Sequence, residues 1–287
     1  MSSAAKTPRA VDVLRRDRDA VIRLGVLGWP VAHSRSPAMH TAALAHLGLD
    51  GWTYQRLPVP PELFAQTVQA LPAAGFVGAN VTIPHKLAAL HLADTSTSTA
   101  RAIGAANTLS FSSGGQIHAD NTDAPGFLAA LPWPVAGRTA LVLGAGGSAR
   151  AIVWALKDAG AADVAVWNRT PARAEHLAQE LSVRAVTQAP RADLLVNCTS
   201  VGLTTTGETF KELPLSADAV EDFSCLVDLV YRDGDTALIT AARERGVAVV
   251  DGLEILVRQG ALSLEAWTGV PAPIDALRDG ARGTTPH

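Results

Sequence analysis

The segment ANVTIPHK (79–86) carries polar residues where a plain buried strand would not need them. Asn80 and Thr82 alternate with Val81 and Ile83, so their side chains share one face at the end of a predicted strand. Lys86 follows at the start of a predicted helix, where the helix dipole disfavours a cation unless an anion lies nearby. Open α/β sheets bind ligands beyond the carboxyl ends of their strands. The pattern therefore indicates a binding site for a small polar or anionic molecule.

Two later segments, GAANT (104–108) and ADNTD (119–123), add further polar groups. They contribute the amide of Asn107 and the carboxylates of Asp120 and Asp123. Asn and Asp are common in turns because they hydrogen-bond to their own backbone, so each of these residues alone is also compatible with a structural role. Whether these residues have a functional role can be judged only together with the other motifs.

A glycine-rich turn, GAGGSA (144–149), follows the apolar segment RTALVL and leads into a helical pattern. In this strand–turn–helix context the motif predicts a dinucleotide site. Gly144 allows the tight turn, Gly146 lets backbone N–H groups approach the pyrophosphate, and Ala149 lets the helix pack closely. The phosphates would be bound by this turn and by the positive end of the helix dipole. The turn consists of Gly144, Ala145, Gly146, Gly147, Ser148 and Ala149.

The next predicted strand ends in Asn168, Arg169 and Thr170, and Arg173 follows one helical turn later. NAD-binding units carry a carboxylate at this position, which accepts hydrogen bonds from the ribose hydroxyls. Two guanidinium groups and a hydroxyl can instead bind a 2′-phosphate through charge-assisted hydrogen bonds. Two solvated surface arginines are the alternative, but cations beside a helix N-terminus are mildly unfavourable without an anion. The sequence favours NADP(H).

Strands and helices alternate along the chain, which predicts an α/β protein with largely parallel sheets. The exception is 107–121, which reads as a hairpin around Ser-Gly-Gly. At the start of the predicted helix 36–48, Ser36 is a candidate N-cap, with Pro37 at the first helical position. We expect a flexible tail over 1–20, a substrate domain over 21–123 completed by 253–287, and a nucleotide domain over 124–252. The segment PWPVAG (132–137), with two prolines and a glycine, is the strongest local signal of a domain boundary.

Composition restricts the class of protein. The 287 residues carry a net charge of −3 and 18% charged residues, which argues against a nucleic-acid partner. No apolar run approaches the ~20 residues of a membrane span, and the N-terminus lacks the apolar core of a secretory signal. Only Cys198 and Cys225 occur, without metal-ligand spacing, so we expect apolar thiols in a reducing cytoplasm and no metal.

Taken together, nine motifs resemble the shikimate dehydrogenase family in order and spacing from about Gly25 to Gln259. They are AHSRSP, GANVTIPHK, GAANTL, DNTDAPGF, VLGAGGSARA, NRT, NCTSVG, DLVY and GLEILVRQ. The resemblance implies an N-terminal substrate domain, a C-terminal Rossmann-like NADP domain, and last helices that return to the first domain. It also implies reversible reduction of 3-dehydroshikimate to shikimate in the pathway to chorismate and the aromatic amino acids.

The resemblance assigns roles to individual positions. Lys86 and Asp123 would form the catalytic pair. Lys86 would give a proton to the ketone oxygen, and Asp123 would orient Lys86. Ser34 and Ser36 would hold the substrate carboxylate. The remaining substrate residues would be Asn80, Thr82, Asn107, Tyr231 and Gln259. Thr199, Ser200, Leu229 and Gly252 would border the cofactor, with Leu229 packing on the nicotinamide.

Three positions depart from the family pattern: Ala124 replaces a usual glycine, Ser98 stands where many members carry an acidic residue, and Leu229 often is methionine. Two rival functions remain. A quinate or quinate/shikimate dehydrogenase shares the framework, but Ser36 and Arg169 favour shikimate with NADP. A redox sensor that binds NADP(H) without catalysis would not need both Lys86 and Asp123. We expect a monomer or homodimer.

Overall fold

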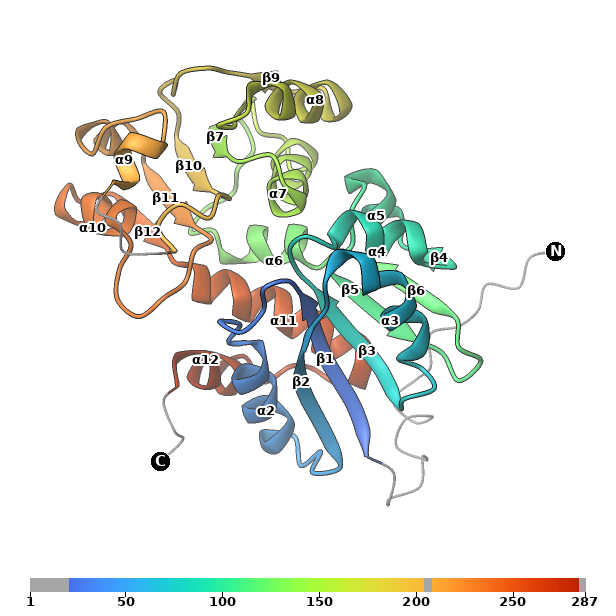
Figure 1. The fold of residues 1–287 in the computed structure, drawn as a ribbon. Helices are drawn as coiled ribbons and strands as arrows, with labels where there is room; N and C mark the ends of the chain where they lie inside the picture. Colours follow the sequence, from blue (N-terminus) through green and yellow to red (C-terminus); the bar gives the residue numbers. More distant parts are fainter. Residues whose placement is uncertain (1–20, 204–207, 284–287) are drawn as a thin grey trace. The chain divides into compact units, whose positions relative to one another are not determined.

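The computed structural model describes residues 21–203 and 208–283. The chain divides into two compact units, one formed by Met1–Thr122 and Val257–His287 and the other by Asp123–Leu256 (Figure 1). Relative to the expected division, Asp123 falls in the second unit, and the return to the first unit begins at Val257 rather than at residue 253. The expected tail over 1–20 lies outside the described residues.

The first unit contains a six-stranded mixed sheet of order β2-β1-β3-β5-β6-β4. Strands β1, β2 and β3 are parallel, and β5 pairs antiparallel with both β3 and β6, as the hairpin pattern predicts. The elements along the chain are β1 Ile22–Gly28, α2 Ser36–His46, β2 Trp52–Pro58, η1 Pro61–Leu63, α3 Phe64–Ala70, β3 Phe76–Val81, α4 Lys86–Leu92, β4 Thr95–Ser96, α5 Ser98–Ile103, β5 Thr108–Phe111 and β6 Ile117–Asp120.

Two helical layers cover this sheet because its strands are apolar on both faces. On one face, Leu27, Ala79 and Val81 pack with Phe64 and Val68 of α3. The other face receives helices from the end of the chain, α11 Gly252–Thr268 and α12 Ile274–Arg282, and α12 packs on α2 (Figure 1).

Glycine permits one of these contacts. A Cβ on Gly78 of β3 would lie 2.1 Å from Nε1 of Trp267, the indole nitrogen that donates a hydrogen bond to the carbonyl of Leu109 at 3.0 Å. A side chain at position 78 would therefore push α11 off the sheet.

The second unit is a parallel six-stranded sheet of order β12-β11-β10-β7-β8-β9. Its elements are α6 Asp123–Ala130, β7 Thr139–Leu143, α7 Gly147–Asp158, β8 Asp163–Trp167, α8 Pro171–Leu181, β9 Arg184–Ala185, β10 Leu194–Asn197, α9 Thr209–Glu212, η2 Asp218–Asp222, β11 Cys225–Asp228, α10 Ala237–Glu244 and β12 Ala248–Val250. The strand order reverses between β7 and β10, which is the doubly wound topology of dinucleotide-binding domains. The predicted α/β class with a Rossmann-like second unit is confirmed.

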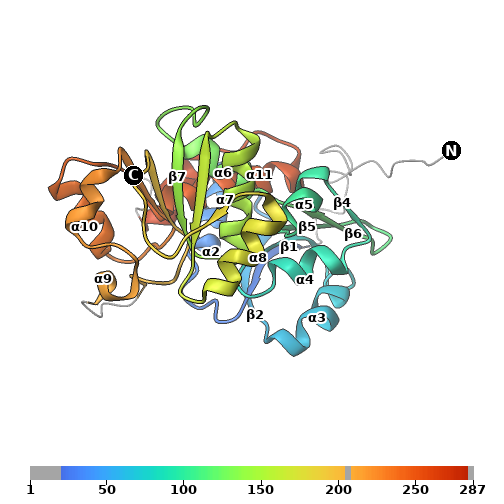
Figure 2. The same cartoon turned by 90° about the horizontal axis from the view of Figure 1, so that it is seen from above.

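The strands of the second unit are buried on both faces, as parallel strands with crossover helices must be. Leu141 and Leu143 of β7 pack with Leu238 and Ile239 of α10. The opposite face meets α7, whose buried side chains include Ile152 and Leu156. In Figure 2, α7 and α10 lie on opposite sides of these strands.

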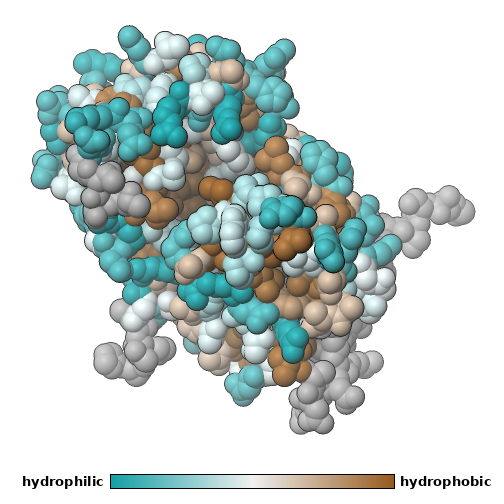
Figure 3. Space-filling model, in the orientation of Figure 1, coloured by the Kyte–Doolittle hydropathy of each residue, from teal (hydrophilic) through white to brown (hydrophobic). Residues whose placement is uncertain are grey.

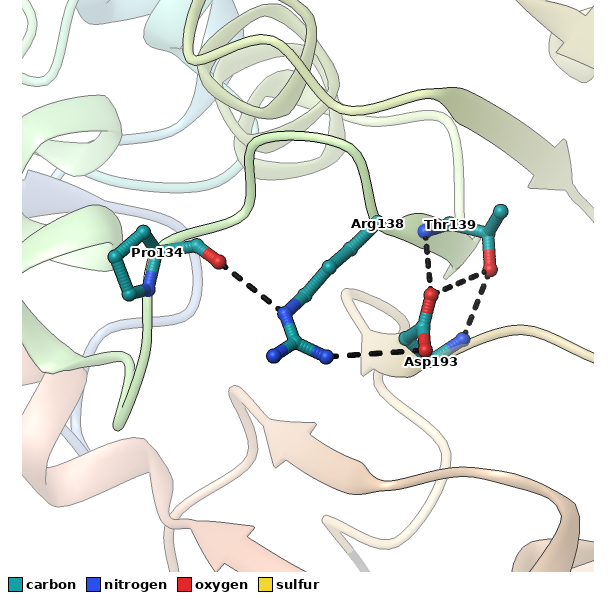
Figure 4. Close-up of polar contacts among 4 residues, drawn as sticks. All are labelled: Pro134, Arg138, Thr139 and Asp193. Atoms are coloured by element: carbon teal, nitrogen blue, oxygen red, sulfur yellow. Dashed lines mark hydrogen bonds and ion pairs between the residues drawn. The ribbon is translucent and has the colours of Figure 1, made fainter.

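A carboxylate connects the beginnings of the central strands β7 and β10 (Figure 4). Asp193 accepts hydrogen bonds from the backbone N–H of Thr139 at 2.8 Å and from its hydroxyl at 3.0 Å, while the Asp193 N–H donates to that hydroxyl. These bonds to Thr139, and then the charge of Arg138, lower the pKa of Asp193. The ionised carboxylate thus sets the register in which β10 enters the sheet.

On the face shown in Figure 3, hydrophilic side chains cover most of the surface and apolar ones occupy smaller areas. Among the described residues, the large apolar side chains with substantial exposure are Val21, Trp29, Leu63, Ile83, Leu87 and Leu203. No helix in the described part of the chain is both long and apolar enough to cross a membrane.

Two local expectations were wrong. Helix α2 begins at Ser36 itself, and no side chain caps it; instead the backbone N–H of Ser36 donates to the hydroxyl of Ser34 at 3.3 Å. The segment 132–137 does not separate the units, because α6 precedes it and packs on α7 within the second unit. In addition, the structure contains helix α12 in a part of the chain where the sequence pattern predicts no element.

Candidate functional site

The glycine turn after β7 lies at the point where the strand order of the second sheet reverses. Gly144 has φ +110°, which L side chains rarely adopt, and a Cβ there would lie 3.1 Å from the carbonyl carbon of Cys198. Position 144 therefore requires glycine both for its backbone conformation and for the close approach of the loop after β10.

Gly146 forms the N-cap of α7, and a Cβ built on it would meet no atom within 4 Å. The space beside its backbone is open, in contrast to the crowded Gly144. Ala149, one turn into the helix, is fully buried, as a small residue packed against the strand should be. An open, glycine-lined helix N-terminus of this kind suits the pyrophosphate of a dinucleotide.

A pocket of about 300 Å³ opens beside this turn. It is lined by residues of the second unit alone: Gly144, Ala145, Gly146, Trp167, Asn168, Arg169, Cys198, Thr199, Ser200, Val201, Gly202 and Glu212. Seven of the predicted cofactor residues are thus brought together. The other predicted cofactor residues do not line it: Gly147, Ser148, Ala149, Thr170, Arg173, Leu229 and Gly252. Trp167, Cys198 and Glu212 are among the lining residues that sequence reasoning missed.

Charge in the pocket comes from Arg169, which follows β8, and from Glu212, the last residue of α9. The Nη1 atom of Arg169 lies 3.5 Å from Oε2 of Glu212. Asn168 donates a hydrogen bond from Nδ2 to the carbonyl of Thr170 at 3.0 Å, which shapes the turn into α8. Thr170 is the N-cap of α8, and Arg173, in its first turn, is exposed. The residues that directly follow β8 (168–170) include no carboxylate, and Arg169 is the group among them that could bind an anion.

The loop after β10 is held by hydrogen bonds that begin at a buried acid. Asp228 accepts from the hydroxyl of Thr236 at 2.6 Å and from Nδ2 of Asn197 at 2.9 Å. The Oδ1 atom of Asn197 in turn accepts from both the N–H and the hydroxyl of Thr199. Burial raises the pKa of Asp228 to about 6, partly offset by these hydrogen bonds. The carboxylate therefore orients the loop that carries Thr199 and Ser200.

Three of the remaining predicted residues lie elsewhere in the second unit. Gly252, at the start of α11, is crowded by the backbone of Leu229: a Cβ there would lie 2.6 Å from the Leu229 carbonyl oxygen. Tyr231 follows two residues after Leu229 and is half-buried. Their roles toward nicotinamide and substrate stay predictions.

In the first unit, the predicted substrate residues of the loops lie at the side of the sheet where the parallel strands β1 and β3 have their carboxyl ends. The segment with Ser34 and Ser36 follows the carboxyl end of β1, and Thr82 follows that of the parallel neighbour β3. A Cβ on Gly28 would lie 2.4 Å from Cγ2 of Thr82, which shows how closely the two strand ends approach. Asn107 joins the same edge because β5 runs antiparallel to β3.

Both serines are buried, and a cation fixes the backbone of the first. The guanidinium of Arg56 on β2 donates to the carbonyl oxygen of Ser34 from Nη2 at 2.6 Å and from Nε at 3.1 Å. Sequence reasoning missed Arg56 because nothing in β2 marks it apart from an ordinary exposed arginine.

Asn80 is the centre of a buried polar network. Its Oδ1 accepts from the hydroxyl of Tyr54 at 2.8 Å, and its Nδ2 donates to Ser263 at 2.9 Å and to the carbonyl of Asn107 at 3.2 Å. Only 5% of Asn80 is exposed. This geometry favours a supporting role behind the site, whereas its predicted contact with substrate stays a prediction.

The amides of Asn107 and Gln259 meet within this network. Nδ2 of Asn107 donates to Oε1 of Gln259 at 3.1 Å, and Oδ1 of Asn107 accepts from the N–H of Thr122 at 2.7 Å. One turn beyond Gln259 on α11, the fully buried Ser263 hydroxyl donates to the Gln259 carbonyl and lies 2.9 Å from the Thr108 hydroxyl. Residues 152 positions apart in the chain are thereby placed side by side.

A histidine beside this network stays neutral. His40 of α2 is fully buried, stacks on Tyr54 with ring centroids 4.3 Å apart, and has neither ring nitrogen hydrogen-bonded. Burial lowers the pKa of His40 to about 3. The stacked rings of His40 and Tyr54 therefore bring no charge to the buried polar network.

The predicted catalytic residues begin two helices. Lys86 is the first residue of α4, is 7% exposed, and accepts a hydrogen bond on its carbonyl from the N–H of Ala106 at 2.8 Å. Asp123 is the first residue of α6 and belongs to the second unit. The pairing of these two side chains stays a prediction. Within the described residues, no group of three or more His, Cys, Asp or Glu side chains could hold a metal ion.

Three family models match this chain. Residues 26–109 match the shikimate dehydrogenase substrate binding domain, residues 129–224 match shikimate/quinate 5-dehydrogenase, and residues 252–279 match the shikimate 5′-dehydrogenase C-terminal domain. The chain is 48% identical over 277 residues to a shikimate dehydrogenase (NADP(+)) of Methylobacterium radiotolerans, covering 91% of this chain and 96% of that relative.

Solved structures of similar proteins include two informative cases. Shikimate 5-dehydrogenase of Thermus thermophilus, in complex with NADP(H) and shikimate, has a TM-score of 0.82 and 43% identity, covering 92% of this chain and all of that one. The ligand-free 5-ketofructose reductase of a Gluconobacter strain has a TM-score of 0.78 and 29% identity, covering 93% of this chain and all of that one.

Proposed function

The chain belongs to the shikimate dehydrogenase family, and we propose that it catalyses the reversible, NADPH-dependent reduction of 3-dehydroshikimate to shikimate. The observation that carries this proposal is the pocket at the switch point of the second sheet. It combines an open glycine turn with Arg169 at the strand end where NAD-binding units place an acid. The similarity to the Thermus enzyme that binds NADP(H) and shikimate supports both ligands.

Different residues of the second unit suit different parts of the cofactor. The backbone at Gly146 and the N-terminus of α7 would bind the pyrophosphate, since backbone N–H groups and the helix dipole favour anions. Arg169 would bind the 2′-phosphate by charge-assisted hydrogen bonds. When bound, NADPH supplies the hydride that reduces the ketone carbon.

The first unit would bind the substrate. Ser34 and Ser36 would hold its carboxylate, while Thr82, Asn107 and Gln259 would bind ring hydroxyls. The hydrogen bond from Asn107 to Gln259 keeps both amides in one orientation, so that little rearrangement is needed when a ligand arrives.

Proton transfer would fall to the lysine–aspartate pair. In the direction of reduction, the ammonium of Lys86 donates a proton to the carbonyl oxygen as negative charge develops there, and in oxidation the neutral amine accepts it. Asp123 would orient Lys86 and hydrogen-bond the reacting or neighbouring hydroxyl.

A spectrophotometric assay tests this function. Purified protein is mixed with NADPH and 3-dehydroshikimate, and nicotinamide absorbance is followed; we expect it to fall, and to rise in the reverse direction with shikimate and NADP⁺. Faster turnover of quinate with NAD⁺ would favour the quinate dehydrogenase alternative. Reduction of 5-ketofructose in preference to 3-dehydroshikimate would place the chain with the Gluconobacter relative instead. NADPH binding without turnover of any substrate would favour a redox sensor.

We also propose that the chain works in the cytoplasm, as a monomer or homodimer. The chain carries only two cysteines, Cys198 and Cys225, without metal-ligand spacing, and such sparse use of cysteine favours a reducing compartment. Light scattering of the reduced protein would distinguish a particle of 29.8 kDa from one of twice that mass.

A further inference from the structure

We infer that Glu212 competes with the 2′-phosphate of NADP(H) for Arg169 and so narrows the preference of this chain for NADP(H) over NAD(H). The inference deepens the proposed function and rests on it, because it requires that Arg169 binds that phosphate. The carboxylate comes from α9, 43 residues beyond the arginine in the chain. No motif of the dinucleotide-binding fold marks its position in the sequence.

The contact itself is the first observation. Oε2 of Glu212 lies 3.5 Å from Nη1 of Arg169, and both residues line the same pocket as Gly144 and Gly146. The side chain of Arg169 is 79% exposed and that of Glu212 is 40% exposed. The pair is therefore accessible to a ligand, and its guanidinium can turn from one anion to another.

The chemistry of the two anions makes them competitors. A guanidinium binds a carboxylate and a phosphate through the same fork of N–H donors, so Arg169 exchanges one for the other. After the exchange, the carboxylate of Glu212 remains near the phosphate and repels it. An unphosphorylated ribose meets neither penalty, because its hydroxyls can donate hydrogen bonds to a carboxylate. Glu212 thus opposes NADP(H) binding more strongly than NAD(H) binding.

The expected effect is modest, because exposed ion pairs are weak and screened by salt. Removing the charge in Glu212→Gln should lower the dissociation constant of NADPH about 1.5- to 5-fold at low salt. The dissociation constant of NADH should stay the same or rise. The gain for NADPH should shrink at about 0.5 M salt, where charges separated by more than a few ångströms are screened.

A four-variant comparison tests the inference. Dissociation constants for NADPH and NADH are measured by calorimetry for the parent, Glu212→Gln, Arg169→Gln and the double variant. We expect Arg169→Gln to weaken NADPH binding alone, and the benefit of Glu212→Gln to disappear in the double variant. Glu208→Gln is the matched control, since Glu208 is exposed at the start of the same helix, pairs with Lys211, and does not line the pocket. It should bind both cofactors as the parent does.

The outcomes distinguish a failure of the role of Glu212 from a failure of the 2′-phosphate site at Arg169. If Arg169→Gln weakens NADPH binding but Glu212→Gln does not strengthen it, Glu212 has no part in selectivity and the inference is wrong. If Arg169→Gln leaves NADPH binding unchanged, the assignment of the 2′-phosphate site fails and the inference fails with it. A similar gain in Glu208→Gln would show a general charge effect and would also overturn the specific role of Glu212.

Discussion

At the scale of single residues, the proposed function depends most directly on Lys86, to which it assigns the proton transfer. Lys86 is 7% exposed and is the first residue of α4, where the helix dipole disfavours a cation. The pocket proposed for the nucleotide is lined by residues of the second unit, and Lys86 belongs to the first. Binding of the nucleotide and proton transfer should therefore be separable by mutation.

We expect Lys86→Ala to lower kcat by about 10²–10⁴-fold, the usual contribution of a positioned acid–base group, and to leave NADPH affinity nearly unchanged. Steady-state kinetics and direct titration of NADPH would measure the two effects. Lys211→Ala, which removes an exposed lysine of α9, serves as control and should retain parental kcat. Parental turnover in the Lys86 variant would refute the catalytic assignment.

At the scale of elements, two buried polar groups connect segments distant in the chain. Asp228, at the end of β11, orients the loop after β10 and holds Thr236 at the start of α10. Its pKa is raised to about 6 by burial, from an ordinary value of 3.8. Between these values the folded protein binds more protons than the unfolded chain, so stability must fall as pH rises across that interval.

We expect the free energy of unfolding of the parent, relative to Asp228→Asn, to decrease by about 2 kcal/mol between pH 4 and pH 6.5. The asparagine does not titrate, so it removes this contribution while keeping the shape of the side chain. Urea denaturation at several pH values would measure both proteins. Parallel stability curves would show that Asp228 does not titrate in this range.

The second group is Ser263, which ties α11 to β3 and β5. Ser263→Ala would deprive the buried Asn80 amide of an acceptor and the Thr108 hydroxyl of a partner. We expect a loss of about 1–3 kcal/mol in the free energy of unfolding, the cost of leaving a buried polar group without its partner. Ser113→Ala, at an exposed turn, should change stability by less than about 0.5 kcal/mol in the same denaturation experiment. Equal stability of the two variants would contradict the network role.

At the scale of the whole molecule, the chain leaves its first unit at Thr122 and returns to it at Val257. The return brings Gln259 and Ser263 to the buried polar network of the first unit, because both come from the same helix that packs Trp267 onto Gly78. The pocket beside the glycine turn, by contrast, is lined by residues of the second unit and by none of the returning segment.

We expect Trp267→Ala to lower the free energy of unfolding by about 3–5 kcal/mol, the usual cost of deleting a buried aromatic side chain. At temperatures where the variant is folded, its NADPH affinity should stay close to the parental value. Calorimetric unfolding and NADPH titration would measure the two properties, with the half-exposed Trp29→Ala as control. Loss of NADPH binding at full folding would mean that the returning segment also shapes the nucleotide pocket.

Local pattern was sufficient for much of the fold. The apolar strands, the hairpin over 107–121 and the turn at 144–149 could be predicted because each depends on neighbours in the chain. The turn, for example, needs Gly144, whose φ of +110° is rarely adopted by residues with a side chain. Expectations failed where long-range contacts decided the result. Ser36 does not cap α2, and PWPVAG does not divide the units, because packing of α6 on α7 outweighs the local signal of two prolines.

The sequence by itself determined the α/β class, the glycine turn, the cationic strand end at Arg169 and the family to which the chain belongs. Only the tertiary structure decided which polar groups meet. It brought Glu212 to Arg169, Arg56 to the carbonyl of Ser34, and Ser263 to Asn80. Such pairs are absent from sequence patterns because periodicity and turn chemistry act over a few residues. Contacts across a sheet or loop depend instead on the register and packing of segments far apart in the chain.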